Sequence, residues 1–227
     1  MKRLFLIASL LLGFANSQIH SEVTGGIKVD GNLSNFILSD PYSENASSKF
    51  GMGFSAGGFA KFEFFNKIAL QPELLLQFRN STIKQKTPID NKDPDIIYIP
   101  EIDYQYFGVE VPLYAMYQSN LESGSKVIFG VGPYLGFGIT AKQKLNIENG
   151  NVMEVDLYQE FNGQKSNMQR FDFGVGVNVA YEFNFMPIQV GLTWKLGLTN
   201  VVNHSDDIYS MKNHSFSLGL GYRFKSK

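Results

Sequence analysis

Residues 171–183 read FDFGVGVNVAYEF, and this stretch decides the fold class. Its odd-numbered positions are all Phe, Val or Tyr, whereas the positions between them are Asp172, Gly174, Gly176, Asn178, Ala180 and Glu182. A period of two is typical of a β-strand, because successive side chains point to opposite faces. The face that carries the charges and glycines is too small and too polar to form an oily core. We therefore expect the apolar face to point outward, into lipid.

The same alternation recurs along the chain, with one apolar face in each segment. The lipid-side positions of these segments contain no Asp, Glu, Lys or Arg. This absence fits a bilayer, because a basic residue at the midplane costs roughly 2–4 kcal/mol. Each segment is long enough for a tilted strand to cross a bilayer. The segments are residues 23–33, 52–64, 68–78, 107–117, 127–139, 171–183, 188–198 and 214–224. The pattern predicts an all-β fold, an eight-stranded antiparallel transmembrane (outer-membrane) β-barrel with up-and-down meander topology.

The connections between these segments alternate between long and short. The short ones are 65–67, 118–126 and 184–187, and the long ones are 34–51, 79–106, 140–170 and 199–213. Outer-membrane barrels have short periplasmic turns and longer extracellular loops, so we expect four extracellular loops and both termini in the periplasm. Within the third long connection, Asn149-Gly150 lies at the centre of residues 144–157 and predicts a β-hairpin above the membrane.

The N-terminal residues differ from the rest of the chain. Lys2 and Arg3 precede the apolar run 4–14, and small residues follow at 15–17, which is typical of a signal peptide. We expect a signal peptide at 1–17 and one barrel domain at 18–227. The 227 residues have a net charge of −1, a mean hydropathy of −0.11 and no cysteine. This composition disfavours nucleic-acid binding, a transmembrane helix, disulfides and thiolate metal sites.

The charged positions of the inward face predict a network that fills the lumen. An eight-stranded barrel has an interior just wide enough for side chains, and buried charges need partners. We expect ion pairs and hydrogen bonds among Lys28, Asp30, Lys61, Glu63, Glu73, Glu110, Asp172, Glu182, Lys195 and Arg223. A path for protons or ions through the same groups is the alternative. No cofactor and no metal site are expected.

Aromatic residues gather at the ends of the predicted strands, where interfacial rings are typical of membrane proteins. The predicted periplasmic girdle consists of Phe62, Phe64, Tyr117, Phe129, Tyr181, Phe183, Tyr222 and Phe224. Phe78, Phe107, Phe137, Phe171 and Phe173 lie at the predicted outer edge. Three prolines, Pro72, Pro112 and Pro133, argue against this reading, because a closed barrel has no edge strand to hold them.

Three functions remain open from these residues alone. The first is a structural or binding role, in which apolar loop residues such as those of 87–103 contact another envelope or surface protein, or pack against one another. The second is passage of small solutes or ions. The third is a lipid-modifying enzyme, whose candidate residues are His204, Ser205, Asp206, Asp207, His214 and Ser215. The first is preferred, so no enzyme is expected.

Five motifs in sequence resemble one known family. Gln71-Pro72-Glu73-Leu74 and the run from Tyr106 to Leu113 are followed by Gly132-Pro133-Tyr134-Leu135-Gly136, Phe171-Asp172-Phe173-Gly174 and the closing run from Gly219 to Phe224. Together they resemble the PorT-like outer-membrane β-barrel family over essentially the whole mature chain, including the prolines. The resemblance implies an integral outer-membrane barrel surrounded by lipid, and an envelope or secretion-accessory role is consistent with it.

Overall fold

The computed structural model describes residues 22–39, 46–64, 67–85, 101–146, 152–159, 168–202 and 210–224. The predicted signal peptide at 1–17 lies outside these residues. The described strands are β1 (Glu22–Leu38), β2 (Ala46–Phe64), β3 (Ile68–Gln85), β4 (Glu101–Asn120), β5 (Lys126–Asn146), β6 (Val152–Asp156), β7 (Phe171–Glu182), β8 (Ile188–Gly197) and β9 (Met211–Arg223).

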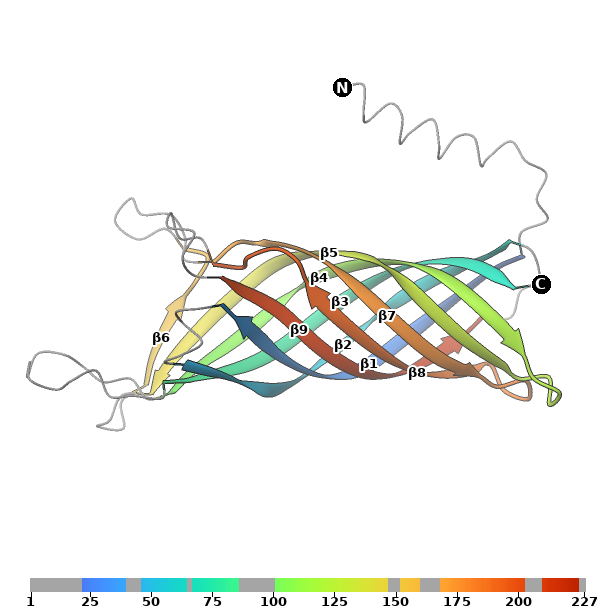
Figure 1. Cartoon of the computed structure of the whole chain (residues 1–227), viewed down its shortest axis with the longest axis horizontal. Coiled ribbons are helices and arrows are strands. Elements are labelled where there is room, and N and C mark those ends of the chain that lie inside the picture. Colours follow the sequence, from blue (N-terminus) through green and yellow to red (C-terminus); the bar gives the residue numbers. More distant parts are fainter. Residues whose placement is uncertain are drawn as a thin grey trace, which may run out of the picture.

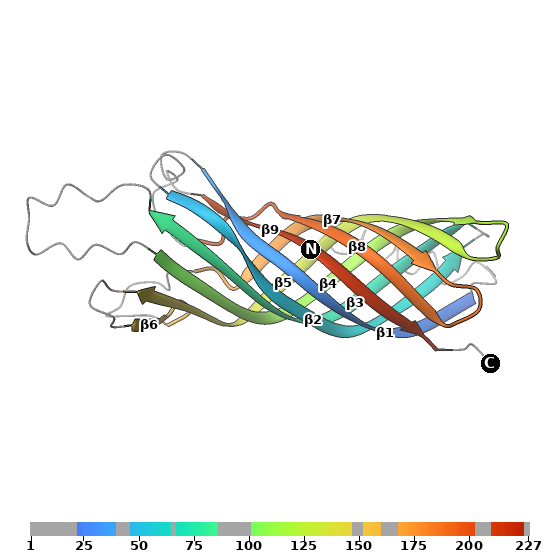
Figure 2. The same ribbon diagram turned by 90° about the horizontal axis from the view of Figure 1, so that it is seen from below.

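Eight of these strands form a closed antiparallel ring. Their order is β4-β3-β2-β1-β9-β8-β7-β5, and pairing of β4 with β5 closes it. Figure 1 shows the strongly tilted strands of the long barrel, and Figure 2 shows the same ring from below. The predicted eight-stranded meander is therefore confirmed. No helix in the described part of the chain is both long enough and apolar enough to span a bilayer.

The two ends of the barrel differ in their connections. The connections 65–67, 121–125 and 183–187 lie at one end, which we call the turn end, together with the start of β1 and the finish of β9. The opposite end, called the loop end, is where the ring strands meet the longer connections of the sequence, and β6 lies there, on the left side of Figure 1.

The barrel exterior is apolar and its interior is polar over the middle of the eight ring strands. Val29, Leu192 and Leu218 on the outer face are 56%, 62% and 59% exposed, whereas Lys28 and Lys195 on the inner face are below 9%. β7 shows the alternation residue by residue, with exposed or half-buried positions at 171, 173 and 175 and buried ones between them. The outward orientation of the apolar face, on which the prediction rested, is confirmed.

The strands extend beyond the predicted segments at the loop end, and there the polarity inverts. On β3 the outward positions become Asn80, Thr82 and Lys84 while Ile83, which points inward, is fully buried. On β4 the outward Glu101 and Asp103 flank the buried Ile102. The predicted segments stopped too early, because an apolar outward face marks only the part of a strand that meets hydrocarbon.

The predicted hairpin of the third long connection is present as a pairing of β5 with β6. Its register runs from Lys142 opposite Asp156 to Asn146 opposite Val152. The central Asn149-Gly150 lies outside the described residues. Among the described strands β6 pairs with β5 alone, so it stands above the ring without belonging to it.

The three in-strand prolines are accommodated by local loss of pairing without a change of register. Pro72 pairs with Leu113, and the next pair of β3 with β4 is Leu75 with Glu110 in the same register. The β4–β5 ladder likewise skips from Pro112 opposite Tyr134 to Ala115 opposite Val131. A proline has no N–H to donate, so a few ladder bonds are missing and the barrel remains closed.

Candidate functional site

A cluster of charges fills the turn end of the lumen. The Lys61 side chain is 1% exposed, and its ammonium lies 3.0 Å from Glu182 and 2.9 Å from Glu63. It also donates a hydrogen bond to the Gln118 side-chain oxygen. Arg223 pairs with Glu182 at 3.1 Å. The cluster joins four predicted lumen residues from β2, β7 and β9 into one network.

A second group of charges lies in the middle of the barrel. Lys28 pairs with Glu73 at 3.1 Å and with Asp30 at 3.6 Å. Ser55 donates a hydrogen bond to Asp30, and Gln71 donates one to Glu73. These contacts join β1, β2 and β3 on the inner wall.

A separate ion pair crosses the lumen at this level. Lys195 of β8 pairs with Glu110 of β4, and both side chains are below 10% exposed. The strands that carry them are not neighbours in the ring.

Asp172 organises the loop-end part of the polar interior. Its carboxylate accepts hydrogen bonds from Tyr134 at 3.2 Å, Asn213 at 2.7 Å and Thr199 at 3.0 Å. The Arg79 guanidinium lies 3.8 Å away from it and 4.4 Å above the centre of the Tyr106 ring.

Arg79 and Lys126 were missed by the sequence analysis. Arg79 lies one residue beyond a predicted strand, and Lys126 lies one residue before another. Lys126 is 3.7 Å from Glu63 and 3.8 Å from Glu182. Each would have been found by continuing the alternation one step further.

With these two residues the ionic interior is balanced. The acids are Asp30, Glu63, Glu73, Glu110, Asp172 and Glu182, and the bases are Lys28, Lys61, Arg79, Lys126, Lys195 and Arg223. Each carboxylate has a cation within 4.0 Å. Partnered charges are what the low-dielectric interior requires.

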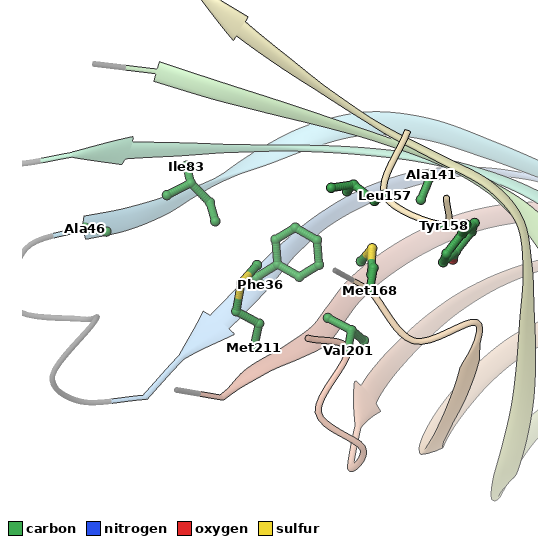
Figure 3. Packing of buried hydrophobic residues seen from close by; sticks show 9 residues of the cluster. All are labelled: Phe36, Ala46, Ile83, Ala141, Leu157, Tyr158, Met168, Val201 and Met211. Atoms are coloured by element: carbon green, nitrogen blue, oxygen red, sulfur yellow. The ribbon is translucent and has the colours of Figure 1, made fainter. Parts of the chain in front are cut away.

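An apolar cluster closes the loop end of the barrel. Figure 3 shows wall residues such as Phe36, Ile83 and Met211 facing residues of the connections. Leu157 and Met168 come from the segment between β6 and β7, and Val201 comes from the segment between β8 and β9. Backbone bonds from Leu157 to Ala141 and from Gln169 to Val201 hold these segments in the mouth.

Small cavities lie within the described interior, and two of them bear on conduction. One lies at the loop end beside Arg79, Phe36, Tyr106 and Leu157, and the centre of a water molecule can occupy about 20 Å³ of it. The other, of about 10 Å³ by the same measure, lies between the middle of the barrel and its turn end, beside Lys28, Glu73 and Gln189. Each has room for about one water molecule, so neither forms a continuous channel.

The predicted girdle residues lie on the outer face near the turn end. Tyr117, Phe129, Tyr222 and Phe224 are 46–52% exposed. Phe62, Phe64, Tyr181 and Phe183 are half-buried, and the Tyr181 and Phe183 rings contact each other at 4.8 Å. All eight are outside the polar interior.

The residues considered for catalysis are not brought together where the structure describes them. His214 faces outward, where its Nε2 accepts a hydrogen bond from Trp194 and its Nδ1 lies 2.8 Å from Asn35. Ser215 is buried inside the barrel. His204, Ser205, Asp206 and Asp207 lie outside the described residues. No group of three or more His, Cys, Asp or Glu in the described ranges could hold a metal ion.

The β5–β6 hairpin at the loop end carries an exposed ion pair. Lys142 and Glu154 are 2.5 Å apart. Their hydrogen bond lowers the pKa of the Glu154 carboxyl and raises the pKa of the Lys142 ammonium.

Comparison with known proteins gives one family match. The model of the family described as "Outer membrane protein beta-barrel domain" matches residues 14–203. No curated protein matches the sequence.

Several solved structures align with the chain over most of its length. Neisserial surface protein A is 13% identical to this chain. The alignment covers 89% of this chain and 99% of that protein, with a TM-score of 0.42. Ail, the attachment invasion locus protein of Yersinia pestis, has 16% identity with coverage of 89% and 99% and a TM-score of 0.41. OprG from Pseudomonas aeruginosa has 13% identity with coverage of 90% and 95% and a TM-score of 0.39.

Proposed function

The chain belongs to the outer membrane protein beta-barrel domain family and lies in the outer membrane, and from this premise we propose that it is a non-conducting, non-enzymatic barrel with a structural or binding role. The role is presentation of the loop end to other envelope or surface proteins. The PorT-like resemblance of the sequence supports an envelope or secretion-accessory task.

The orientation belongs to the same proposal. The turn end, with the start of β1 and the finish of β9, faces the periplasm, and the loop end faces the cell exterior. The four longer connections are then the extracellular loops. The inverted polarity of the strand extensions supports this, because outward Lys84 and Glu101 suit water better than lipid.

The lumen is occupied at three levels, and this occupation is the main support for a non-conducting barrel. Lys61 and Glu182 fill the turn end, the Lys195–Glu110 pair crosses the middle, and the apolar cluster around Phe36 closes the loop end. A hydrated ion would have to break buried ion pairs and then enter an apolar mouth, and both steps are costly.

Planar-bilayer recording tests this part of the proposal. We expect the purified protein to give no discrete conductance. A Glu110→Ala/Lys195→Ala variant, which removes only the crossing pair, should also give none, because the Lys61 cluster and the apolar loop-end cluster still occupy the lumen. Reproducible single-channel steps in the wild type would favour the small-solute channel instead.

The binding role is tested by site-specific photo-crosslinking in intact cells. Met153 of β6 is 55% exposed at the loop end, and Leu121 is 40% exposed at the turn end. A photoreactive residue at 153 should give a discrete crosslinked protein, and the same residue at 121 serves as the matched control. Crosslinks from 121 alone would place the partner on the other side of the membrane.

The non-enzymatic part has its own test. Mass spectrometry of lipid A should show the same species with and without expression of the chain, and with His204→Ala or His214→Ala. A new lipid species that disappears in either variant would establish the enzyme alternative.

A further inference from the structure

The short strand β6 has an unpaired edge along its whole length. Among the described strands it pairs with β5 alone, through five continuous pairs from Lys142 opposite Asp156 to Asn146 opposite Val152. The ring strands differ from it, because each of them has a neighbour on both sides. Figure 1 and Figure 2 show β6 at the loop end of the barrel. It therefore offers a strand edge to which a further strand can be added.

The hydrogen bonds of the β5–β6 ladder show which backbone groups are left on that edge. The Leu157 amide donates to the Ala141 carbonyl, and this pair continues the register of the ladder. In an antiparallel ladder, residues that exchange hydrogen bonds with the partner strand alternate with residues whose N–H and C=O groups point away from it. Residues 153 and 155 therefore bond to β5, whereas the N–H and C=O groups of 152, 154 and 156 point to the open edge.

This edge lacks the features that usually protect an exposed strand. Proteins block such edges with proline, lysine, a β-bulge or a covering segment. The sequence of β6 is VMEVD, and its register with β5 is unbroken. Val152 and Met153, whose side chains point to opposite faces, are 62% and 55% exposed, and Glu154 is exposed as well. Both faces of the strand are thus accessible next to its open edge.

The side chains of β6 indicate what an added strand would contain. Glu154 and Asp156 share one face of the strand, and Met153 lies on the other. Lys142 pairs with Glu154, but it belongs to β5 and so lies one strand spacing, about 4.8 Å, further from the open edge. Opposite charges on directly opposed residues favour strand pairing. An added strand should therefore place basic residues beside the two acids and apolar residues beside Met153.

We propose that β6 binds an extended segment of another envelope or surface protein by antiparallel β-strand addition, and that this segment alternates basic with apolar residues. The inference rests on the binding role proposed above and adds to it the mode of binding and the chemistry of the partner. A second copy of this chain fits less well. Antiparallel pairing of two β6 strands centred on Glu154 would place two carboxylates opposite each other, which is destabilising.

The first test uses a capped, fluorescently labelled peptide of seven residues that alternates lysine with valine. It is titrated into the full chain in nanodiscs of zwitterionic lipid, with fluorescence anisotropy as the signal and empty nanodiscs subtracted. In the proposed pairing the lysine amides face β6 and the valine amides face away. Methylation of the lysine amide nitrogens should weaken binding at least about tenfold, whereas methylation of the valine amide nitrogens should not. No binding of the unmethylated peptide, or equal binding of the two methylated ones, would overturn the proposal.

Two substitutions at one position separate the backbone edge from the carboxylate. Glu154→Ala removes the carboxylate and keeps the edge N–H, so peptide binding should fall by no more than about fivefold, as for other exposed charge pairs. Glu154→Pro also removes the N–H, which is not part of the β5 ladder, and its ring occupies the place of the partner strand. Binding should therefore fall about tenfold further than in Glu154→Ala.

Exchange of the Gln143 amide, which bonds to β6, should be equal in the two variants and so report an intact hairpin. Equal peptide binding by two such variants would contradict strand addition. If proline disrupts the hairpin, the two methylated peptides still decide the question, because they leave the protein unchanged.

Crosslinking in cells distinguishes this mode of binding from the binding role itself. A photoreactive residue at 153 should capture its partner in Glu154→Ala and lose it in Glu154→Pro. Capture by both variants would leave the binding role standing and overturn strand addition, whereas no capture from 153 in the otherwise unchanged chain would refute both. A crosslinked product of twice the mass of the chain would indicate a second copy and overturn the proposed partner.

Discussion

Removal of Lys195 should leave the Glu110 carboxylate buried and unpaired in the middle of the barrel. The two side chains are 8% and 2% exposed, and the second oxygen of Glu110 has no hydrogen-bond partner among the described residues. Breaking a buried pair by removing one partner typically costs about 3–5 kcal/mol. We expect Lys195→Met to lower the free energy of unfolding by this amount.

The double variant Lys195→Met/Glu110→Gln should recover most of this loss. It places two uncharged side chains of similar volume in the lumen, and replacement of a whole buried pair is often nearly neutral. We expect its free energy of unfolding to lie within about 1 kcal/mol of the wild type, so the second substitution should restore at least about 2 kcal/mol of the roughly 3–5 kcal/mol that Lys195→Met removes.

Reversible urea unfolding in lipid vesicles measures these values, with the fluorescence of Trp194, the one tryptophan of the chain, as the signal. A loss of about 3 kcal/mol moves the urea midpoint by about 1–3 M. Lys84→Met is the control, because the Lys84–Glu101 pair is more than a third exposed and should contribute less than about 1 kcal/mol. If Lys195→Met costs no more than this control, the lumen is not the dry, paired interior described above.

Three further predictions test other parts of the molecule. Leu218→Arg, on the lipid face, should cost about 2–4 kcal/mol in vesicle unfolding, whereas Tyr222→Arg near the turn end should cost about 0–1 kcal/mol, and equal costs would contradict the placement of the bilayer. Lys142 holds the pKa of the Glu154 carboxyl below its usual value, so this pair stabilises the β5–β6 hairpin above about pH 4.3, and the stabilisation is lost as the pH falls through the lowered pKa. Amide exchange of residues 152–156 should therefore accelerate at low pH in the wild type and be much less pH-dependent in Lys142→Gln. Gly138→Val should displace Tyr158 at a cost of about 1–3 kcal/mol and speed amide exchange in residues 157–158 without moving the exchange of β7.

The eight ring strands and the orientation of their faces were predictable from the sequence, because the bilayer excludes charge from the outer face and so leaves an unbroken alternation. Residues such as Val175, Leu192 and Leu218 carry this signal. Most inward charges followed from the same alternation. Their partners did not, because Lys195 and Glu110 come from strands that are distant in sequence and face each other only after the ring closes.

The loop end was predicted less well, for a physical reason. Beyond the bilayer the strands bury apolar side chains inward, as Ile83 does, so the rule that located the membrane segments has the opposite sign there. Register irregularities between Phe50 and Phe54 and between Phe107 and Gly108 also shift the alternation. Arg79 was missed at this boundary, and so was the position of the Tyr158 hydroxyl against Gly138 of β5.

The inversion of polarity along the strands also fixes the depth of the barrel in the bilayer. Sliding by one residue, about 3.3 Å along a strand, would draw outward polar groups such as Asn80 or Lys49 toward the acyl chains at one rim. A shift in the opposite direction would move exposed apolar side chains such as Phe54 out of the acyl chains and into water. The outer face of the barrel therefore sets its position along the bilayer normal, and a membrane of different thickness would have to adapt to this position.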